Sequence, residues 1–432
     1  MSRDAATTII QTLREHGHVA YLAGGCVRDR LLGVAPKDHD VATDAPPDVV
    51  QKLFRRSQPV GEAFGVILVY APGINPNADA EPQRGEASGT DRPQRRFVPI
   101  EVATFRTEGV YSDGRRPDEV NFTTAEHDAQ RRDFTINGLF EDPLHPDTPN
   151  PDADGHGVID YVGGRADLES KTLRAIGDPD RRFGEDYLRM LRAVRFTTRL
   201  GFTLDPSTAQ AIRNLSKFLS QISRERIGGE LQLMLTTPHF AASADLLQQL
   251  RLDGPTLNED HLDAEMSVLT RLSPDAGYAA KLTAWMIDRH GLAAATPARV
   301  RRWRKALCLS NDDTDTLNRI LRQLHAAEDW ATMSVAKRKR LLSMTDWDQT
   351  LLVWRAMKRA DAIDADTPAL IEDGIGLAPA PLVDGADLIA MQLKPGPLFK
   401  TLLDQVYDAQ LEGRVTDRQA ALAWVRQSAS EG

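Results

Sequence analysis

Two aspartates one residue apart, Asp38 and Asp40, have the residue type and spacing that metal-assisted chemistry needs. They lie in the stretch GGCVRDRLLGVAPKDHDVAT, which runs from Gly24 to Thr43. If this segment is a strand, residues i and i+2 point to the same face, and the two carboxylates lie side by side. Unpaired carboxylates repel each other, and a divalent cation removes that conflict. Two hard oxygen ligands with open positions suit Mg²⁺ bound together with the phosphates of a substrate.

Gly24 and Gly25 open the same stretch, immediately before a predicted helix. Glycine lets the backbone approach a phosphate closely, and a helix N-terminus offers free N–H groups. Arg28 adds a cation in the first turn of that helix. A Gly-Gly pair alone is usually a turn, and Asp-X-Asp alone is more often a cap or a surface pair. In this order and spacing, the residues predict a site for a nucleoside triphosphate with two metal ions.

Two other short motifs carry charge next to apolar residues. Glu101 lies in PIEVATF, where it is either a third carboxylate of the site or an edge-strand surface charge. Arg131, Arg132 and Asp133 open RRDFTINGL, which is either a polar site or a solvated entry to a buried element.

The segment 181–199, RRFGEDYLRMLRAVRFTTR, predicts one helix. On it, Asp186 and Arg189 are i and i+3 and therefore neighbours. Arg189, Arg192 and Arg195 fall within about half of the helix circumference at ~3.6 residues per turn. The pattern indicates either a solvated face or an anion-binding surface.

The elements that would position these residues are α/β in the first 165 residues. Alternating apolar residues and turn signals predict a small mixed sheet with helices. The predicted strands are 18–25, 38–43, 65–71, 97–105 and 136–140, and the predicted helices are 26–33 and 46–54. Two polar segments, 72–96 and 141–157, contain too few large apolar residues to order themselves, so we predict a disordered insertion near 72–96 and a linker.

Helical periodicity dominates from about residue 168 to the C-terminus. We therefore expect an α/β head at 1–165, followed by an elongated all-α remainder that divides into a neck at 166–250 and a body and tail at 251–432. With 432 residues, 41% of them hydrophobic and 27% charged, the composition is typical of a soluble protein with several domains.

The charge is unevenly distributed. The net charge is −9, yet segment 181–230 holds ten Arg or Lys against five Asp or Glu. RVRRWRK (299–305) and KRKR (337–340) are further basic clusters, which are either solvated helix faces or polyanion-binding surfaces. The only cysteines, Cys26 and Cys308, exclude a cysteine-rich zinc site and favour a cytoplasmic location, and no stretch is long enough to span a membrane.

Taken together, GGCVRDRLLG, KDHD, IEVATFR, RRDFTINGL and EDYLRMLRAVRF resemble the class II tRNA nucleotidyltransferase and bacterial poly(A) polymerase family, in the same order. The resemblance covers roughly residues 20–235. The segment VDGADLIAMQLKPGPLFKTLLDQV also resembles the family's tail, whereas residues 240–380 resemble nothing we can defend. The resemblance implies a nucleotidyltransferase head, a neck that binds nucleotide and RNA, and a body and tail that bind tRNA.

The resemblance also implies residue roles. Asp38 and Asp40 would be catalytic and bind two Mg²⁺ ions, with Glu101 as a third catalytic carboxylate. The nucleotide-binding residues that it implies are Gly24, Gly25, Arg28, Arg131, Arg132, Asp133, Asp186, Arg189, Arg192 and Arg195.

Asp186 and Arg189 suggest how a base could be chosen without a nucleic-acid template. Cytosine and adenine each present an exocyclic amino donor beside an unprotonated ring nitrogen, and guanine and uracil invert this pattern. A carboxylate only accepts and a guanidinium only donates, so the pair matches C and A. The simpler interpretation is an ordinary intrahelical salt bridge.

The resemblance predicts template-independent addition of CMP and AMP from CTP and ATP to the tRNA 3′ end, which completes the CCA terminus. A basic loop within 106–122, containing Gly109, Gly114, Arg115 and Arg116, argues against an enzyme that adds only cytidines. The alternatives are a poly(A) polymerase, an enzyme that adds only A, and a non-catalytic RNA-binding relative. GEAFGVILV lacks the basic run that we associate with the poly(A) branch. The sequence leaves the oligomeric state uncertain.

Overall fold

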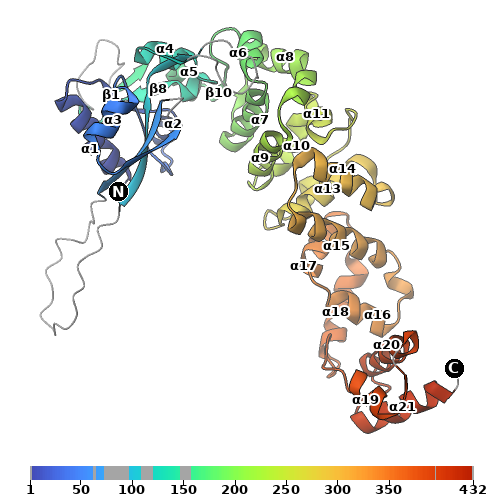
Figure 1. Ribbon diagram of the computed structural model, residues 1–432. Coiled ribbons are helices and arrows are strands. Elements are labelled where there is room, and N and C mark those ends of the chain that lie inside the picture. Colours follow the sequence, from blue (N-terminus) through green and yellow to red (C-terminus); the bar gives the residue numbers. More distant parts are fainter. Residues whose placement is uncertain are drawn as a thin grey trace, which may run out of the picture. The chain divides into compact units, whose positions relative to one another are not determined.

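The computed structural model describes residues 2–61, 65–72, 97–108, 120–145, 157–394 and 396–430. The chain divides into two compact units (Figure 1). Unit 1 contains residues 1–226 and 250–255, and unit 2 contains residues 227–249 and 256–432. The predicted disordered insertion and most of the predicted basic loop and linker lie outside the described residues, and the predicted division into head, neck and body stays a prediction.

Unit 1 contains a seven-stranded mixed sheet with the strand order β3-β4-β5-β2-β1-β8-β9. Strand β2 pairs in parallel with β5, and the other neighbouring strands are antiparallel. The strands are β1 (Ala20–Ala23), β2 (Asp40–Thr43), β3 (Ser57–Gly61), β4 (Val66–Pro72), β5 (Phe97–Thr104), β8 (Leu139–Glu141) and β9 (Val158–Asp160). This sheet confirms the predicted α/β head.

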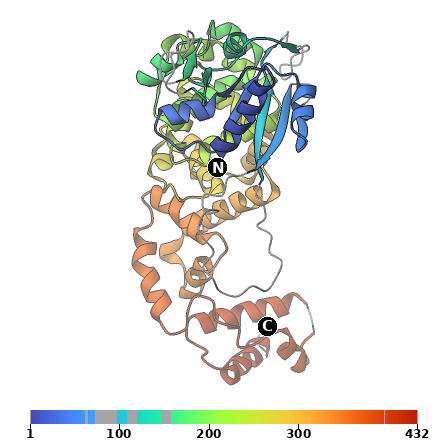
Figure 2. The ribbon, with the colours of Figure 1, turned by 90° about the vertical axis from the view of Figure 1, so that its left-hand side faces the viewer.

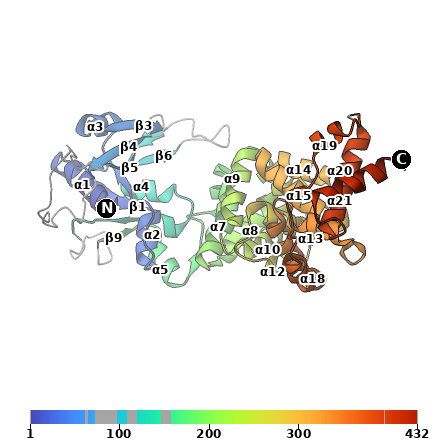
Figure 3. The same ribbon diagram turned by 90° about the horizontal axis from the view of Figure 1, so that it is seen from below.

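Five helices accompany the sheet, and Figure 3 shows them around the strands. They are α1 (Ser2–Glu15), α2 (Gly25–Leu31), α3 (Pro47–Leu53), α4 (Ala125–Gln130) and α5 (Gly164–Glu169). Helix α1 is amphipathic and buries Ile9, Ile10 and Leu13. Phe105 and Phe140 meet edge to face at 5.9 Å between ring centroids, which fixes the centre of the sheet where the site residues are attached.

Three predicted elements differ in the structure. Strand β2 begins at Asp40, so Asp38 lies in the preceding loop and not in the strand. The predicted strand 136–140 is a 3₁₀ turn, Thr135–Asn137, followed by β8. The predicted helix 181–199 is two helices, α6 (Pro179–Glu185) and α7 (Leu188–Leu200), with a break at Asp186.

The remaining elements of unit 1 are short strands and helices. Strands β6 (Arg106–Glu108) and β7 (Val120–Phe122) pair antiparallel, and β10 (Thr172–Leu173) and β11 (Thr203–Leu204) pair in parallel. Helix α8 (Pro206–Leu215) begins at a capping aspartate, Asp205, which accepts a hydrogen bond from Thr208 N.

In its described residues, unit 2 contains helices joined by loops and no strand, which confirms the largely helical remainder (Figures 1 and 2). The helix at the boundary between the units is α9 (Arg224–Leu235). The other helices are α10 (Phe240–Gln249), α11 (Asp253–Leu257), α12 (Ser267–Arg271), α13 (Tyr278–His290), α14 (Pro297–Leu307), α15 (Asn311–Ala327), α16 (Val335–Leu342), α17 (Trp347–Ala356), α18 (Asp361–Glu372), α19 (Gly385–Ala390), α20 (Pro397–Leu411) and α21 (Arg418–Ser430). Among the described residues, no helix is long and apolar enough to cross a membrane.

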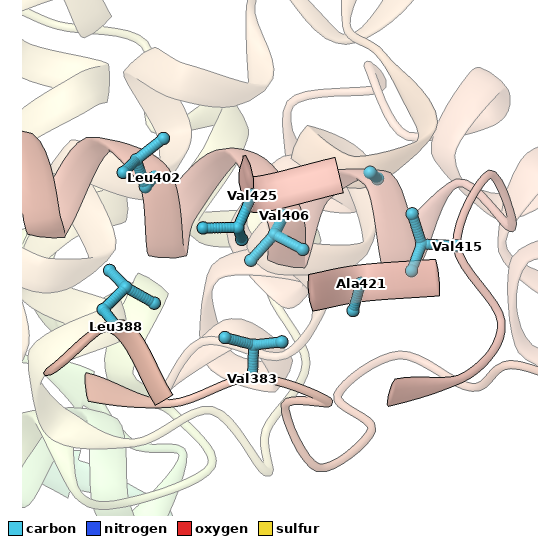
Figure 4. Packing of buried hydrophobic residues seen from close by; sticks show 8 residues of the cluster. Val383, Leu388, Leu402, Val406, Val415, Ala421 and Val425 are labelled. Carbon is cyan, nitrogen blue, oxygen red and sulfur yellow. The ribbon is translucent and has the colours of Figure 1, made fainter. Parts of the chain in front are cut away.

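The last three helices form a small apolar core of their own. Figure 4 shows Leu388 of α19, Leu402 and Val406 of α20, and Ala421 and Val425 of α21 pointing toward one another. These side chains are nearly fully buried. The core explains why the short helix α19, which begins with an aspartate capping box at Asp384, is held in place.

Candidate active site

One pocket of about 490 Å³ lies within unit 1 and brings the predicted site residues together. Of the thirteen predicted site residues, twelve line it, and the exception is Asp38. The lining includes Gly24, Gly25, Arg28, Asp40, Glu101, Arg131, Arg132, Asp133, Asp186, Arg189, Arg192 and Arg195. Arg199 also lines the pocket, so seven arginines face four carboxylates, and the arginine excess favours an anionic ligand.

Two of the pocket's carboxylates, those of Asp40 and Glu101, come from the neighbouring strands β2 and β5. Val41 of β2 pairs in parallel with Val102 of β5, so the residues immediately before them, Asp40 at the start of β2 and Glu101 inside β5, lie at the same level of the sheet. The surrounding protein desolvates Asp40, although its side chain is exposed in the pocket, and this raises its pKa to about 6. The nearby charges of Glu101 and Asp38 raise the pKa further, and Arg132 opposes them.

These carboxylates fit a divalent cation that takes its remaining ligands from elsewhere. In the described residues, no group of three His, Cys, Asp or Glu side chains could hold a metal ion by itself. The mutual repulsion that raises the pKa of Asp40 is nevertheless the conflict that a cation relieves. Oxygen ligands on an open surface suit an ion shared with substrate phosphates. Asp38 lies close enough to Asp40 to affect its pKa, although it does not line the pocket.

The turn before α2 needs a residue without a side chain at Gly24. Gly24 has a φ of 72°, and a Cβ there would lie 2.7 Å from Nη1 of Arg132. The Gly24 N–H donates to the carbonyl of Leu139 at 2.9 Å, which ties the turn to β8. Glycine at this position therefore lets Arg132 lie directly against the backbone that faces the pocket.

Arg28 is buried and held on both sides. Its guanidinium donates to Oδ1 of Asp29 at 2.6 and 2.8 Å and to Oδ1 of Asn137 at 2.6 Å. Asn137 in turn donates from Nδ2 to Oδ1 of Asp133 at 3.0 Å. The 3₁₀ turn that replaces the predicted strand thus places an amide between the arginine and the aspartate of two separate motifs.

Two buried aspartates, Asp128 and Asp133, position arginines that line the pocket. Asp128 of α4 pairs with Arg131 at 2.8 Å and with Arg132 at 3.0 Å. Burial would raise the pKa of Asp128, but the two guanidiniums outweigh it and hold the pKa below its ordinary value. Asp133 pairs with Arg192 at 2.8 Å; burial would raise the pKa of Asp133, but Arg192 and the hydrogen bonds from Asn137 and the Phe134 N–H outweigh it and lower this pKa. Both carboxylates are therefore ionised at neutral pH.

The break at Asp186 corrects the expected helix-surface pair. Oδ1 of Asp186 accepts from the Leu188 N–H at 3.0 Å and so starts α7, and Oδ2 pairs with Arg226 at 2.7 Å. Arg189 pairs with Glu185 at 2.6 Å and donates to the carbonyl of Arg182 at 2.9 Å. Asp186 and Arg189 both line the pocket, but each is held by its own partner, so the alternative interpretation of a salt bridge between them within one helix is wrong.

The remaining arginines gather around one ring. The guanidiniums of Arg28, Arg192 and Arg195 lie 5.2, 5.3 and 4.5 Å from the ring centroid of Phe196. Such cation–π contacts attract the cations to the ring face and keep them near one another despite their like charge. Phe196 also lines the pocket.

Sequence reasoning missed six residues that hold the predicted ones: Asp29, Asp128, Asn137, Glu185, Phe196 and Arg226. Asp128 is three and four residues before Arg131 and Arg132, a spacing that indicates helix-surface pairs. Asn137 and Phe196 lie inside quoted motifs. Arg226 has no local signal, because forty residues separate it from Asp186.

Comparisons with known proteins agree with this geometry. Residues 20–174 match the family described as the Poly A polymerase head domain, and residues 201–254 match the family described as the probable RNA and SrmB-binding site of polymerase A. The crystal structure of the Bacillus stearothermophilus CCA-adding enzyme in complex with CTP is similar, with a TM-score of 0.72 and 26% identity. That likeness covers 99% of this chain and 98% of the other.

The CCA-adding enzyme of Lactiplantibacillus plantarum is 31% identical over 424 residues, which cover 97% of this chain and 94% of the relative. This chain belongs to the CCA-adding enzyme family. Its members are nucleotidyltransferases that use divalent metal ions. The CCA-adding enzyme of Bacillus pumilus is 38% identical over 260 residues, and this match spans 60% of the chain and 56% of the relative. The full-length match includes residues 240–380, for which the sequence motifs showed no resemblance.

Proposed function

We propose that this chain adds CMP and AMP, from CTP and ATP, to the 3′ end of tRNA without a nucleic-acid template. The observation that carries the proposal is that Asp40 and Glu101 line the same pocket as Asp186 and Arg189. Carboxylates for catalysis and a donor–acceptor pair for a base are then available to one bound nucleotide. The names of the relatives, and CTP in a similar structure, support the same reaction.

In the proposed reaction, the tRNA 3′-hydroxyl attacks the α-phosphate in line, and pyrophosphate leaves. We propose that Asp38 and Asp40 bind two Mg²⁺ ions and that Glu101 is a further catalytic carboxylate. Bound metal would activate the attacking oxygen and neutralise the negative charge on the leaving one. Arg28, Arg131, Arg132 and the arginines of α7 would hold the triphosphate and ribose. Since these side chains are already paired and oriented, they lose little freedom when the nucleotide binds.

The decisive assay uses tRNA that lacks its CCA end, with CTP and ATP supplied singly and together, and product length read at single-nucleotide resolution. Two additions with CTP alone and a third with both nucleotides support the proposal. A long ladder with ATP alone would identify a poly(A) polymerase instead. Addition of A only to tRNA that already ends in CC would identify an A-adding enzyme, and no transfer at all would favour a non-catalytic RNA-binding relative. The Asp40→Asn variant provides the inactive control.

We further propose that Asp186 and Arg189 select the base. Asp186→Ala and Arg189→Ala should lower incorporation of C and A and narrow the gap to U and G, because the opposed polar groups that reject U and G are gone. Competition between the four nucleotides, with melting temperature as the control for folding, measures this effect. Unchanged selectivity in both variants would contradict the assignment. We also propose that the protein works in the cytoplasm, as its cysteine content indicates.

A further inference from the structure

The two basic clusters of the sequence, RVRRWRK and KRKR, have similar composition but different surroundings. In KRKR, on α16, Arg338 pairs with Asp366 at 2.9 Å and Arg340 pairs with Asp408 at 2.6 Å. Lys339 is fully buried and pairs with Asp373. Three of its four cations are thus neutralised inside unit 2, and this cluster ties helices together.

The basic cluster RVRRWRK, on α14, differs because most of its cations lie on the exposed side of the helix. The inner face of the helix buries Val300 and Trp303, together with Ala306 and Leu307 at its end. The exposed side carries Arg301, Arg302, Arg304 and Lys305, and the helix contains no acidic residue.

At ~100° per residue, these four cations cover an arc of about 160° on the side opposite the buried residues. In the part of the chain that the structure describes, Arg301, Arg302 and Lys305 form no ion pair and no side-chain hydrogen bond, and Arg304 donates only to Oδ1 of Asn311 at 2.7 Å. The cationic face is therefore open to an external anion.

A close backbone contact fixes this face relative to α9. A Cβ at Gly228 would lie 2.0 Å from the carbonyl oxygen of Leu307, so the end of α14 rests directly on α9. Gly228 lies within residues 201–254, which match a family described as a probable RNA-binding site. Figure 1 shows α14 beside α13 and α15, and α14 packs against α15.

We propose that the exposed face of α14 binds the phosphate backbone of the tRNA substrate. This inference rests on the proposed function for the identity of the RNA. Four unpaired or nearly unpaired cations on a rigid helix complement a regular row of phosphates and carry no base-specific information. A cationic strip of this kind also explains how a protein with a net charge of −9 holds a polyanion.

The test measures equilibrium binding of tRNA lacking CCA to the full-length chain between about 50 and 200 mM salt, with the triple variant Arg301→Gln, Arg302→Gln, Lys305→Gln. The dissociation constant should rise roughly 10- to 100-fold at the lower salt concentration, and the slope of log affinity against log salt should become shallower by about two to three units. Affinity for CTP should stay unchanged.

The matched control is Arg355→Gln, Arg359→Gln, Arg414→Gln. These three exposed arginines are paired with Asp364, Glu328 and Glu412, and their loss changes the net charge by the same amount. Equal effects of the two triple variants, or no effect of the α14 variant, would overturn the proposal, and the second result would leave an acidic protein as the occupant of the face. Because binding is measured without catalysis, a chain that binds tRNA through α14 but transfers no nucleotide would refute the proposed activity alone.

Discussion

The acidic residues in and beside the pocket have two separate roles. Within the described part of the chain, Asp40 and Glu101 form no ion pair, and desolvation, with the charge of Glu101 adding to it, raises the pKa of Asp40 to about 6. Asp128 and Asp133 are instead paired with arginines, and their pKa values are lowered. The first pair is left free to take up a cation, whereas the second pair fixes the anion-binding side chains.

The raised pKa of Asp40 predicts a pH dependence of stability. Between about pH 4 and pH 6, the folded protein keeps a proton on Asp40 that the unfolded chain has already lost. The free energy of unfolding should therefore contain a contribution from Asp40 that falls as the pH rises through this window. In metal-free buffer, urea denaturation of wild type and Asp40→Asn should show the variant gaining relative stability from pH 4 to pH 6.5. Parallel pH profiles for the two proteins would contradict the assignment.

Removing Asp128 should disturb both stability and nucleotide binding. Asp128→Ala leaves Arg131 and Arg132 without their shared carboxylate, and breaking a buried ion pair costs about 3–5 kcal/mol. We also expect weaker binding of CTP, because the two guanidiniums lose their fixed orientation. Urea denaturation and CTP titration measure the two effects. Lys52 and Asp48 form an exposed pair on α3, so Asp48→Ala serves as the control and should change the free energy of unfolding far less than Asp128→Ala does.

At the scale of elements, the close approach of α9 and α14 depends on one glycine. Gly228→Ala would place a methyl group 2.0 Å from the Leu307 carbonyl oxygen, and it should destabilise the protein by at least about 1–3 kcal/mol. The neighbouring Gly229 has no atom within 4 Å of a built Cβ, so Gly229→Ala should be neutral or stabilising by up to about 1 kcal/mol. Thermal melting of the two variants compares them directly, and equal melting temperatures would show that α14 can move away at little cost.

An element could be predicted from the sequence when the interactions that define it are local in the chain. Strands β4 and β5 follow local alternation of apolar residues, and both were predicted. The break between α6 and α7 was not, because apolar periodicity continues across it and the stabilising partner of Asp186 is Arg226, which is remote in the sequence. The 3₁₀ turn at Thr135–Asn137 was predicted as part of a strand for a similar reason. Its residues are buried as those of a strand would be, and the hydrogen bond that Asn137 accepts from Arg28 is not visible in the local sequence.

The site residues themselves were easier to predict than their geometry. Twelve of the thirteen line one pocket, because their motifs lie on or beside the central strands β1, β2 and β5 and along α7. Their partners could not all be found, since an ion pair such as Asp133 with Arg192 forms between elements that are far apart in the chain. The roles assigned to these residues remain predictions for the experiments above.

At the scale of the whole molecule, the division into two units predicts separable unfolding. The pocket lies entirely in unit 1, so a nucleotide that binds there stabilises that unit by mass action and leaves unit 2 unaffected. Calorimetry should show two unfolding transitions. CTP at about 100 times its dissociation constant should raise the melting temperature of one of them, by the shift that corresponds to about 2.7 kcal/mol of added stability. The same titration with Asp186→Ala should give a smaller shift, and equal shifts of both transitions would show that the units unfold together.

The pairing of β5 on both sides has a consequence for how this chain can change during evolution. Val102 is in register with Ile67 of β4 and with Val41 of β2, so both neighbours fix the position of Glu101. A single residue gained or lost inside β5 would turn Glu101 to the opposite face of the sheet. Residues gained between Pro72 and Phe97 leave that register intact. Length variation among descendants of this gene should therefore accumulate in that connection, while the strands on either side keep their lengths.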